Sequence, residues 1–169
     1  AGEKNLPSKL SKSAEGQAPA VEMMRDLFGG TEHVRAMGQK YLPQAPGETN
    51  AQYQQRLQGA VFFNFVRKTV EGLSGFVFAK DPKFSEDVPA IIREQWENCD
   101  MAGTHGDVFI RDVFADALLV GHAAILVEYP KTEGLQLYSE ERGPDATVRP
   151  YLVHVRKDSM VNWRTENRG

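Results

Sequence analysis

Five phenylalanines lie in one short stretch of the chain, AVFFNFVRKTVEGLSGFVFAKDP, which runs from Ala60 to Pro82. This stretch follows a polar run, GETNAQYQQRLQG, in which Thr49 and Gln52 have the spacing of a capping box. In that arrangement each side chain satisfies a free backbone N–H of the other at the start of a helix. Only Gly59 disfavours a helix between Thr49 and Glu71, so the sequence predicts one long helix over 49–71.

The two halves of the predicted helix differ in character. In the first half Tyr53 and Leu57 fall on one face at helical spacing, and polar residues fill the rest. In the second half the apolar residues point in almost every direction, which a helix tolerates when protein surrounds it. We therefore expect core or interface positions, buried within the domain or between subunits, at Phe62, Phe63, Phe65, Val66 and Leu73.

Composition limits the class of protein. The chain has 169 residues, of which 41% are hydrophobic and 25% charged, as in an ordinary globular domain. No apolar run reaches the ~20 residues that cross a bilayer, and the first residues lack the apolar centre of a signal peptide. The single cysteine, Cys99, cannot form an intrachain disulfide and fits a reducing compartment. We expect a protein made in the cytoplasm, and kept there or packaged from it.

The pattern along the chain predicts an α+β, helix-dominated fold. Residues 1–18 are rich in Ser, Lys, Gly and Glu and are predicted to form a flexible N-terminal arm, so that 19–169 forms the domain. Further helices are expected near 19–30, 31–42, 88–100 and 104–121. The segments HAAILVEYP and PYLVHV have the length and branched side chains of buried strands, and we expect them to pair in one small mixed sheet.

No spacing in the sequence indicates a catalytic, cofactor or metal site. The four histidines show no HxxxH or HExxH pattern, and Cys99 has no CxxC partner. The segment GLSG is one residue too short for a nucleophile elbow, and no phosphate-binding glycine loop is present. We therefore predict a protein that is not an enzyme and needs no cofactor.

The two tryptophans have different expected roles. Trp96 lies near Ile91 and Ile92 in a predicted amphipathic helix, where a core position is favoured. Trp163 lies among polar residues, so that core and interface positions are equally compatible with the sequence.

A series of short motifs resembles the N-terminal part of tailed-bacteriophage portal proteins. The resemblance covers residues 38–165, and it depends on the order and spacing of the motifs more than on any one of them. The departures are small: Lys68 and Ala79 stand at positions where the resemblance leads us to expect Arg or another basic residue. The motifs are YLPQ (41–44), Glu48, Tyr53, Arg56, FFN (62–64), RKTVEGLSGFVFAKDP (67–82), Asp100, Gly103, ILVEYP (125–130), RPYL (149–152) and NWR (162–164).

The resemblance implies a structural role at one vertex of a phage head. A ring of usually twelve subunits would form the conduit through which double-stranded DNA is packaged and later ejected, without specific binding. Its partners would be the capsid protein, the terminase and a head-completion or tail adaptor, with no membrane. The resemblance also implies assembly in the bacterial cytoplasm, a place in the virion, and a wing-like domain at 19–169 that lacks the stem, clip and crown segments.

Two other functions remain open. A small nucleic-acid-binding or head-completion adaptor would need an exposed basic cluster, although a net charge of -3 with mixed signs disfavours a general DNA-binding surface. An uncharacterised hydrolase would need His105, Asp107 and His122 to meet in one pocket. The basic cluster would be drawn from Lys9, Lys12, Arg142, Arg149, Arg156, Lys157, Arg164 and Arg168.

Overall fold

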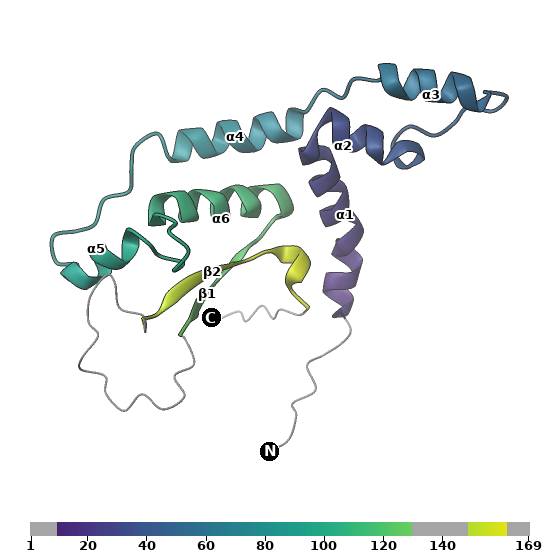
Figure 1. Cartoon of the computed structure of the whole chain (residues 1–169). Helices are drawn as coiled ribbons and strands as arrows, with labels where there is room; N and C mark the ends of the chain where they lie inside the picture. Colours follow the sequence, from purple (N-terminus) through teal and green to yellow (C-terminus); the bar gives the residue numbers. More distant parts are fainter. Residues whose placement is uncertain (1–9, 130–148, 162–169) are drawn as a thin grey trace, which may run out of the picture. The chain divides into compact units, whose positions relative to one another are not determined.

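The computed structural model describes residues 10–129 and 149–161, and over these residues the fold is α+β and helix-dominated (Figure 1). The chain divides into two compact units. Of the described residues, the first unit contains 10–73 and 160–161, and the second contains 74–129 and 149–159, so that α4 crosses the boundary between Leu73 and Ser74. The elements are α1 (Lys12–Gly29), α2 (Thr31–Ala36), α3 (Asn50–Gly59), α4 (Phe65–Val77), α5 (Ala90–Trp96), α6 (Gly106–Val120), β1 (Ala124–Glu128) and β2 (Tyr151–Val155), with short 3-10 helices at Gly38–Lys40 and Lys157–Ser159.

The first helix begins inside the segment that was expected to be a flexible arm. Ser11 caps α1, because its hydroxyl accepts a hydrogen bond from the Ala14 N–H at 3.2 Å. The prediction of an arm to residue 18 is therefore wrong from Lys12 onward, while residues 1–9 lie outside the described part. Helix α1 ends at Gly30, whose φ of 83° is accessible to glycine without strain.

The predicted long helix over 49–71 is two helices. The capping box at Thr49 is confirmed, with both reciprocal hydrogen bonds present, but α3 ends at Gly59 and α4 begins at Phe65. Between them the backbone bonds to α2. The Thr31 hydroxyl donates to the Phe62 carbonyl at 3.1 Å, and the Arg35 side chain donates to the Ala60 carbonyl at 2.8 Å. These contacts replace the helical hydrogen bonds that residues 60–64 would otherwise make.

The second unit contains the sheet. Strands β1 and β2 pair as predicted, in an antiparallel register from Ala124 opposite Val155 to Glu128 opposite Tyr151, so that the sheet is antiparallel and not mixed. Helix α6 lies against β2, where the Phe109 and His154 rings meet edge to face at 6.5 Å. The buried apolar residues of this unit are Cys99, Phe109, Leu119 and Val120.

The described helices do not include a membrane span, because none combines sufficient length with sufficient apolar character. The polar segment expected between the two strands lies almost wholly at 130–148, outside the described residues, and so does Trp163.

Candidate interaction surface

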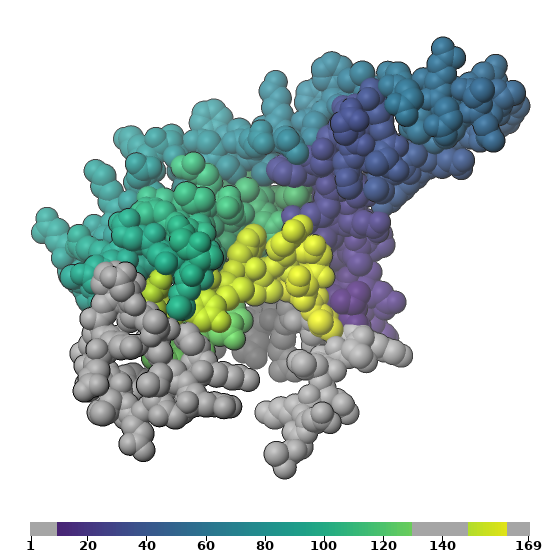
Figure 2. All heavy atoms as spheres, in the orientation of Figure 1, coloured from purple at the N-terminus to yellow at the C-terminus, as the bar shows by residue number. Residues whose placement is uncertain are grey.

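Helix α4 turns its apolar side outward. Its buried positions are Val70 and Ser74, which are each 6% exposed. About 120 to 180° around the helix from these positions, Phe65 is 67% exposed and Phe76 is 82% exposed. Leu73 and Val77 are also exposed and complete one apolar stripe along the helix, which we call the α4 stripe. Figure 2 shows atoms of α4 at the molecular surface.

The side of α4 away from the stripe holds the helix to its own chain. The Arg67 guanidinium donates to the Phe28 carbonyl at 3.1 Å and lies over the Phe28 ring at 4.9 Å. Asn64, directly before the helix, donates to the same carbonyl and accepts from the Arg67 N–H at 2.8 Å. Because polar contacts face the protein, the apolar stripe is left to face away from it.

The exposed aromatic area is large for a single helix. Phe63 directly precedes α4, is 77% exposed and stacks on Phe65 with ring centroids 6.2 Å apart. At roughly 200 Å² for a fully exposed phenylalanine, Phe63, Phe65 and Phe76 present on the order of 450 Å² of apolar surface. An area of that size is within the range of the largest apolar patch on a monomeric protein, roughly 300 to 600 Å², and such patches are often functional.

These exposures correct part of the expectation for the Phe-rich stretch. Phe63, Phe65 and Leu73 are not core residues of the chain, so the expectation of burial within the domain is wrong for them. Phe62 and Val66 are half-buried. Burial between subunits stays a prediction for all five residues.

Strand β1 shows the same conflict between its sequence and its exposure. Its run of Ile125, Leu126 and Val127 is typical of a strand covered on both faces. All five of its residues are nevertheless exposed, and Val127 is 65% exposed. The predicted burial of this strand is therefore wrong for the chain by itself. The structure thus presents a second apolar surface, of a different kind from the α4 stripe.

Trp96 is half-buried and packs within the second unit. Its indole N–H donates to the Asp107 carboxylate at 2.9 Å, and its ring meets Phe84 edge to face at 5.4 Å. Gly106 lies directly against the ring, where a Cβ atom would approach to 2.1 Å. Trp96 thus packs against neighbouring side chains but is not one of the buried core residues, and Ile91 and Ile92 beside it are exposed.

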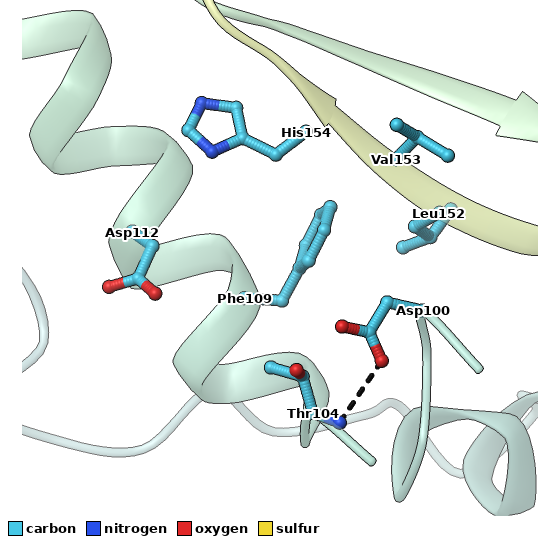
Figure 3. A pocket seen from close by; sticks show the side chains of 7 residues that line it. All are labelled: Asp100, Thr104, Phe109, Asp112, Leu152, Val153 and His154. Carbon is cyan, nitrogen blue, oxygen red and sulfur yellow. Dashed lines mark hydrogen bonds between the residues drawn. The ribbon is translucent and has the colours of Figure 1, made fainter. Parts of the chain in front are cut away.

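A shallow cavity of about 320 Å³ opens between α6 and β2 (Figure 3). The Asp100 carboxylate at its rim accepts hydrogen bonds from the backbone N–H groups of Ala102 and Thr104, at 2.8 and 3.0 Å. Burial alone would raise the pKa of Asp100, but these bonds, with one from the Thr104 side chain, outweigh it and hold the pKa below its ordinary value. The other residues that line the cavity are Phe109, Asp112, Leu152, Val153 and His154.

The three residues of the hydrolase hypothesis do not line this cavity. His105 caps α6, since its Nδ1 accepts from the Asp107 N–H at 3.2 Å, and Asp107 in turn accepts from Trp96. At His122, burial and then the charge of Lys157 lower the pKa, which favours the neutral ring. Among the described residues, no three His, Cys, Asp or Glu side chains gather as metal ligands.

Four of the eight basic residues of the adaptor hypothesis lie in the described part of the chain, and three of these four form bonds within the fold. Arg149 is buried and donates to the Asn98 carbonyl, and Lys157 is buried and donates to the Val120 carbonyl at 2.8 Å. Arg156 is paired with Asp158 at 3.4 Å. Lys12 is exposed on α1. The remaining four, Lys9, Arg142, Arg164 and Arg168, lie outside the described residues.

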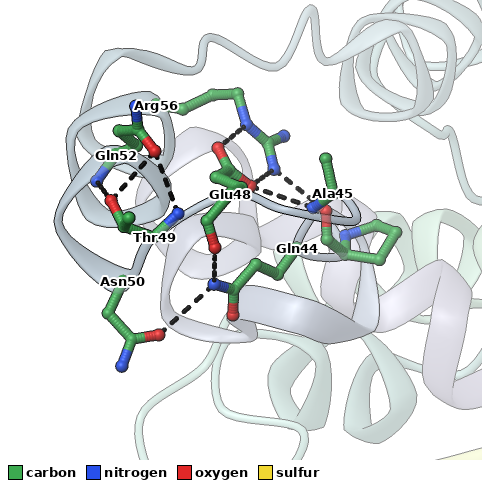
Figure 4. Close-up of polar contacts among 8 residues, drawn as sticks. Gln44, Ala45, Glu48, Thr49, Asn50, Gln52 and Arg56 are labelled. Carbon is green, nitrogen blue, oxygen red and sulfur yellow. Dashed lines mark hydrogen bonds and ion pairs between the residues drawn. The ribbon is translucent and has the colours of Figure 1, made fainter.

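Two clusters of hydrogen-bonded polar side chains in the first unit were not predicted from the sequence. Asp26 on α1 is 7% exposed and accepts from Lys40 at 2.6 Å, Tyr41 at 2.7 Å and His33 at 3.0 Å. In the second cluster the Arg56 guanidinium donates twice to Glu48, at 2.7 and 2.8 Å (Figure 4). The Arg56 pair, followed by a hydrogen bond from the Ala45 N–H, lowers the pKa of Glu48 to about 2.

Among known proteins, no family model and no curated sequence matches the chain. Its function is therefore inferred from the motifs and surfaces described above.

Proposed function

We propose that the chain is a structural subunit of a portal-like ring, the kind of assembly through which phage DNA enters and leaves the head. It acts by holding neighbouring copies and other head proteins in place, and it carries out no chemical reaction. Its fold would correspond to the outer, wing-like part of a portal subunit.

The exposed α4 stripe is the observation that supports this proposal most directly. A stable specific contact buries ~800 Å² on each partner, and the three phenylalanines on and beside the stripe supply on the order of half of that area. Aromatic residues are also the side chains that contribute most binding energy at interface centres. We infer that another polypeptide packs on this surface in the assembled protein.

The motif residues support a structural role in a second way. Tyr41 bonds to Asp26, Glu48 bonds to Arg56, and Asn64 bonds to the Phe28 carbonyl. Arg149 bonds to the Asn98 carbonyl. These residues of the portal-like series are thus contacts that shape the fold, as expected where the function of a protein is to hold a shape.

Charge is consistent with a conduit through which DNA slides. The net charge is -3, and two of the basic residues that could have formed a DNA-binding cluster are buried against backbone carbonyls. Tight DNA binding depends on exposed Lys and Arg that displace counterions from phosphates. Within residues 10–129 and 149–161, neither the adaptor nor the hydrolase hypothesis has a comparable observation in its favour.

Sedimentation equilibrium tests the role of the stripe. We expect the wild-type chain to self-associate as its concentration rises from micromolar toward millimolar. Replacing two stripe residues, Phe65→Gln with Phe76→Gln, should weaken association about tenfold or more, because glutamine keeps the helix but removes the aromatic surface.

The matched control is Ile92→Gln, an exposed apolar residue on α5. It should leave the association constant unchanged, and circular dichroism should show the same helix content in all three proteins. A wild-type chain that stays monomeric to millimolar concentration would contradict the proposal. So would a stripe variant that associates as strongly as the wild type.

A further inference from the structure

We propose that the α4 stripe of one copy packs against β1 of the next copy, a contact that deepens the proposed function and rests on it. The two surfaces are different parts of the same chain, so the contact is heterologous. Each copy then has one surface of each kind, and the same contact can repeat from copy to copy.

Sequence and exposure together identify these two surfaces. Helix α4 and strand β1 each have the apolar sequence of a buried element, and each is exposed in the single chain. A contact between two α4 stripes would cover the helix and leave β1 bare, and a contact between two β1 strands would do the reverse. One heterologous contact covers both, and only a heterologous contact generates a ring or a filament.

The dimensions of the two surfaces agree. From Phe65 to Phe76 the stripe extends for about 16 Å at 1.5 Å per residue. Strand β1 has five residues, about 17 Å at 3.4 Å per residue. A helix laid along the strand would therefore cover the full length of one face, the face that bears Ile125 and Val127.

The charged residues next to the two surfaces have opposite signs. Lys68 is exposed on α4 and lies beside the stripe, one turn from Phe65 and Gly72. Glu128 is exposed and ends β1, directly after Val127. Opposite charges at the rim of an apolar contact favour the correct orientation of the partners more than they add affinity.

A complementation experiment tests the contact. One variant loses the stripe through Phe65→Gln with Phe76→Gln. The other loses one face of β1 through Ile125→Thr with Val127→Thr, two residues on the same face of the strand, and keeps β-branched residues at both positions. One of the two carries a fluorophore at its N-terminus. Both are studied by sedimentation velocity, alone and mixed, at a concentration at which the wild type associates.

A heterologous contact predicts that each variant is monomeric alone. Their mixture should form a one-to-one heterodimer, because each supplies the surface that the other lacks, and it should grow no further. The Ile92→Gln control should behave as the wild type, and circular dichroism should show that all variants keep the native secondary structure.

The other outcomes each contradict the contact in a distinct way. A β1 variant that self-associates as the wild type does would assign the contact to two α4 stripes, and a stripe variant that does so would assign it to two β1 strands. A mixture that stays monomeric would also overturn the proposal. A wild-type chain that never associates would overturn the proposed function itself, and this contact with it.

Discussion

At the scale of single residues, Asp26 is the carboxylate that links several segments of the first unit by hydrogen bonds. Its carboxylate joins α1 to the segment that follows α2, through Lys40 and Tyr41, and to His33 within α2. The hydrogen bond from Lys40, followed by those from His33 and Tyr41, holds the pKa of Asp26 well below its ordinary range. The carboxylate therefore stays ionised over the whole physiological range.

Replacing this carboxylate should destabilise the protein. We expect Asp26→Asn to lower the free energy of unfolding by about 1.5 to 3 kcal/mol at neutral pH, the usual contribution of hydrogen bonds to a charged group. Urea denaturation measures the loss. The control is Glu22→Gln, which removes an exposed carboxylate that also bonds to Lys40 and should change stability little.

The same loss should depend on pH with a defined sign. A carboxylate with a lowered pKa in the folded state contributes stability above its unfolded pKa of about 4. That contribution disappears as the pH falls from there toward the much lower folded pKa. The gap between the wild type and Asp26→Asn should therefore narrow below about pH 4. A gap that stays constant under acid conditions would show that Asp26 acts through packing and not through its charge.

At the scale of secondary-structure elements, the features that depend on local sequence signals were predicted well. The capping box at Thr49 is present where it was predicted, and α6 ends before Gly121, the last residue of the helix predicted near 104–121. The pairing of HAAILVEYP with PYLVHV is likewise confirmed. Each of these features is decided by residues close in sequence or by a simple match between two apolar runs.

The break between α3 and α4 could not be predicted in the same way. Its cause is distant in sequence, because Thr31 and Arg35 on α2 bond to the backbone at Phe62 and Ala60. The sequence contains one local signal for the start of a new helix at this point. It is Asn64, because asparagine is favoured directly before a helix. It lies between phenylalanines, whose apolar character favoured a continuous helix.

The Thr31 contact gives a direct test of this explanation. The Thr31 hydroxyl donates to the Phe62 carbonyl at 3.1 Å and accepts from the Phe62 N–H at 3.3 Å. Thr31→Val keeps the shape of the side chain and removes both hydrogen bonds. We expect it to lower the free energy of unfolding by about 1 to 3 kcal/mol.

Chemical denaturation of the matched variant Thr69→Val provides the comparison. Thr69 is exposed on α4, and a substitution there should change stability by less than about 0.5 kcal/mol. If Thr31→Val is no more destabilising than Thr69→Val, the break is held by something other than the bonds to α2.

At the scale of the whole molecule, the sequence identified apolar elements without showing what covers them. Apolar periodicity reports that α4 and β1 favour burial, and it contains no information on whether the cover comes from the same chain or another. The sequence therefore identified residues of the candidate surface, including Phe63 and Phe65, as apolar positions that favour burial. It did not show that they are exposed together on one side of the folded chain. Only the exposure of these residues in the folded chain distinguishes an interface from a core.

The last prediction concerns assembly size. The three phenylalanines on and beside the α4 stripe present on the order of 450 Å², below the ~800 Å² that each partner buries in a stable contact. Area beyond the stripe must come from the less exposed rim, and association also costs translational and rotational freedom. We expect mainly monomers and small oligomers at micromolar concentration, measured by sedimentation velocity and electron microscopy. A discrete ring of about twelve copies from this chain alone would contradict a weak contact. It would place strong ring-forming contacts within these 169 residues.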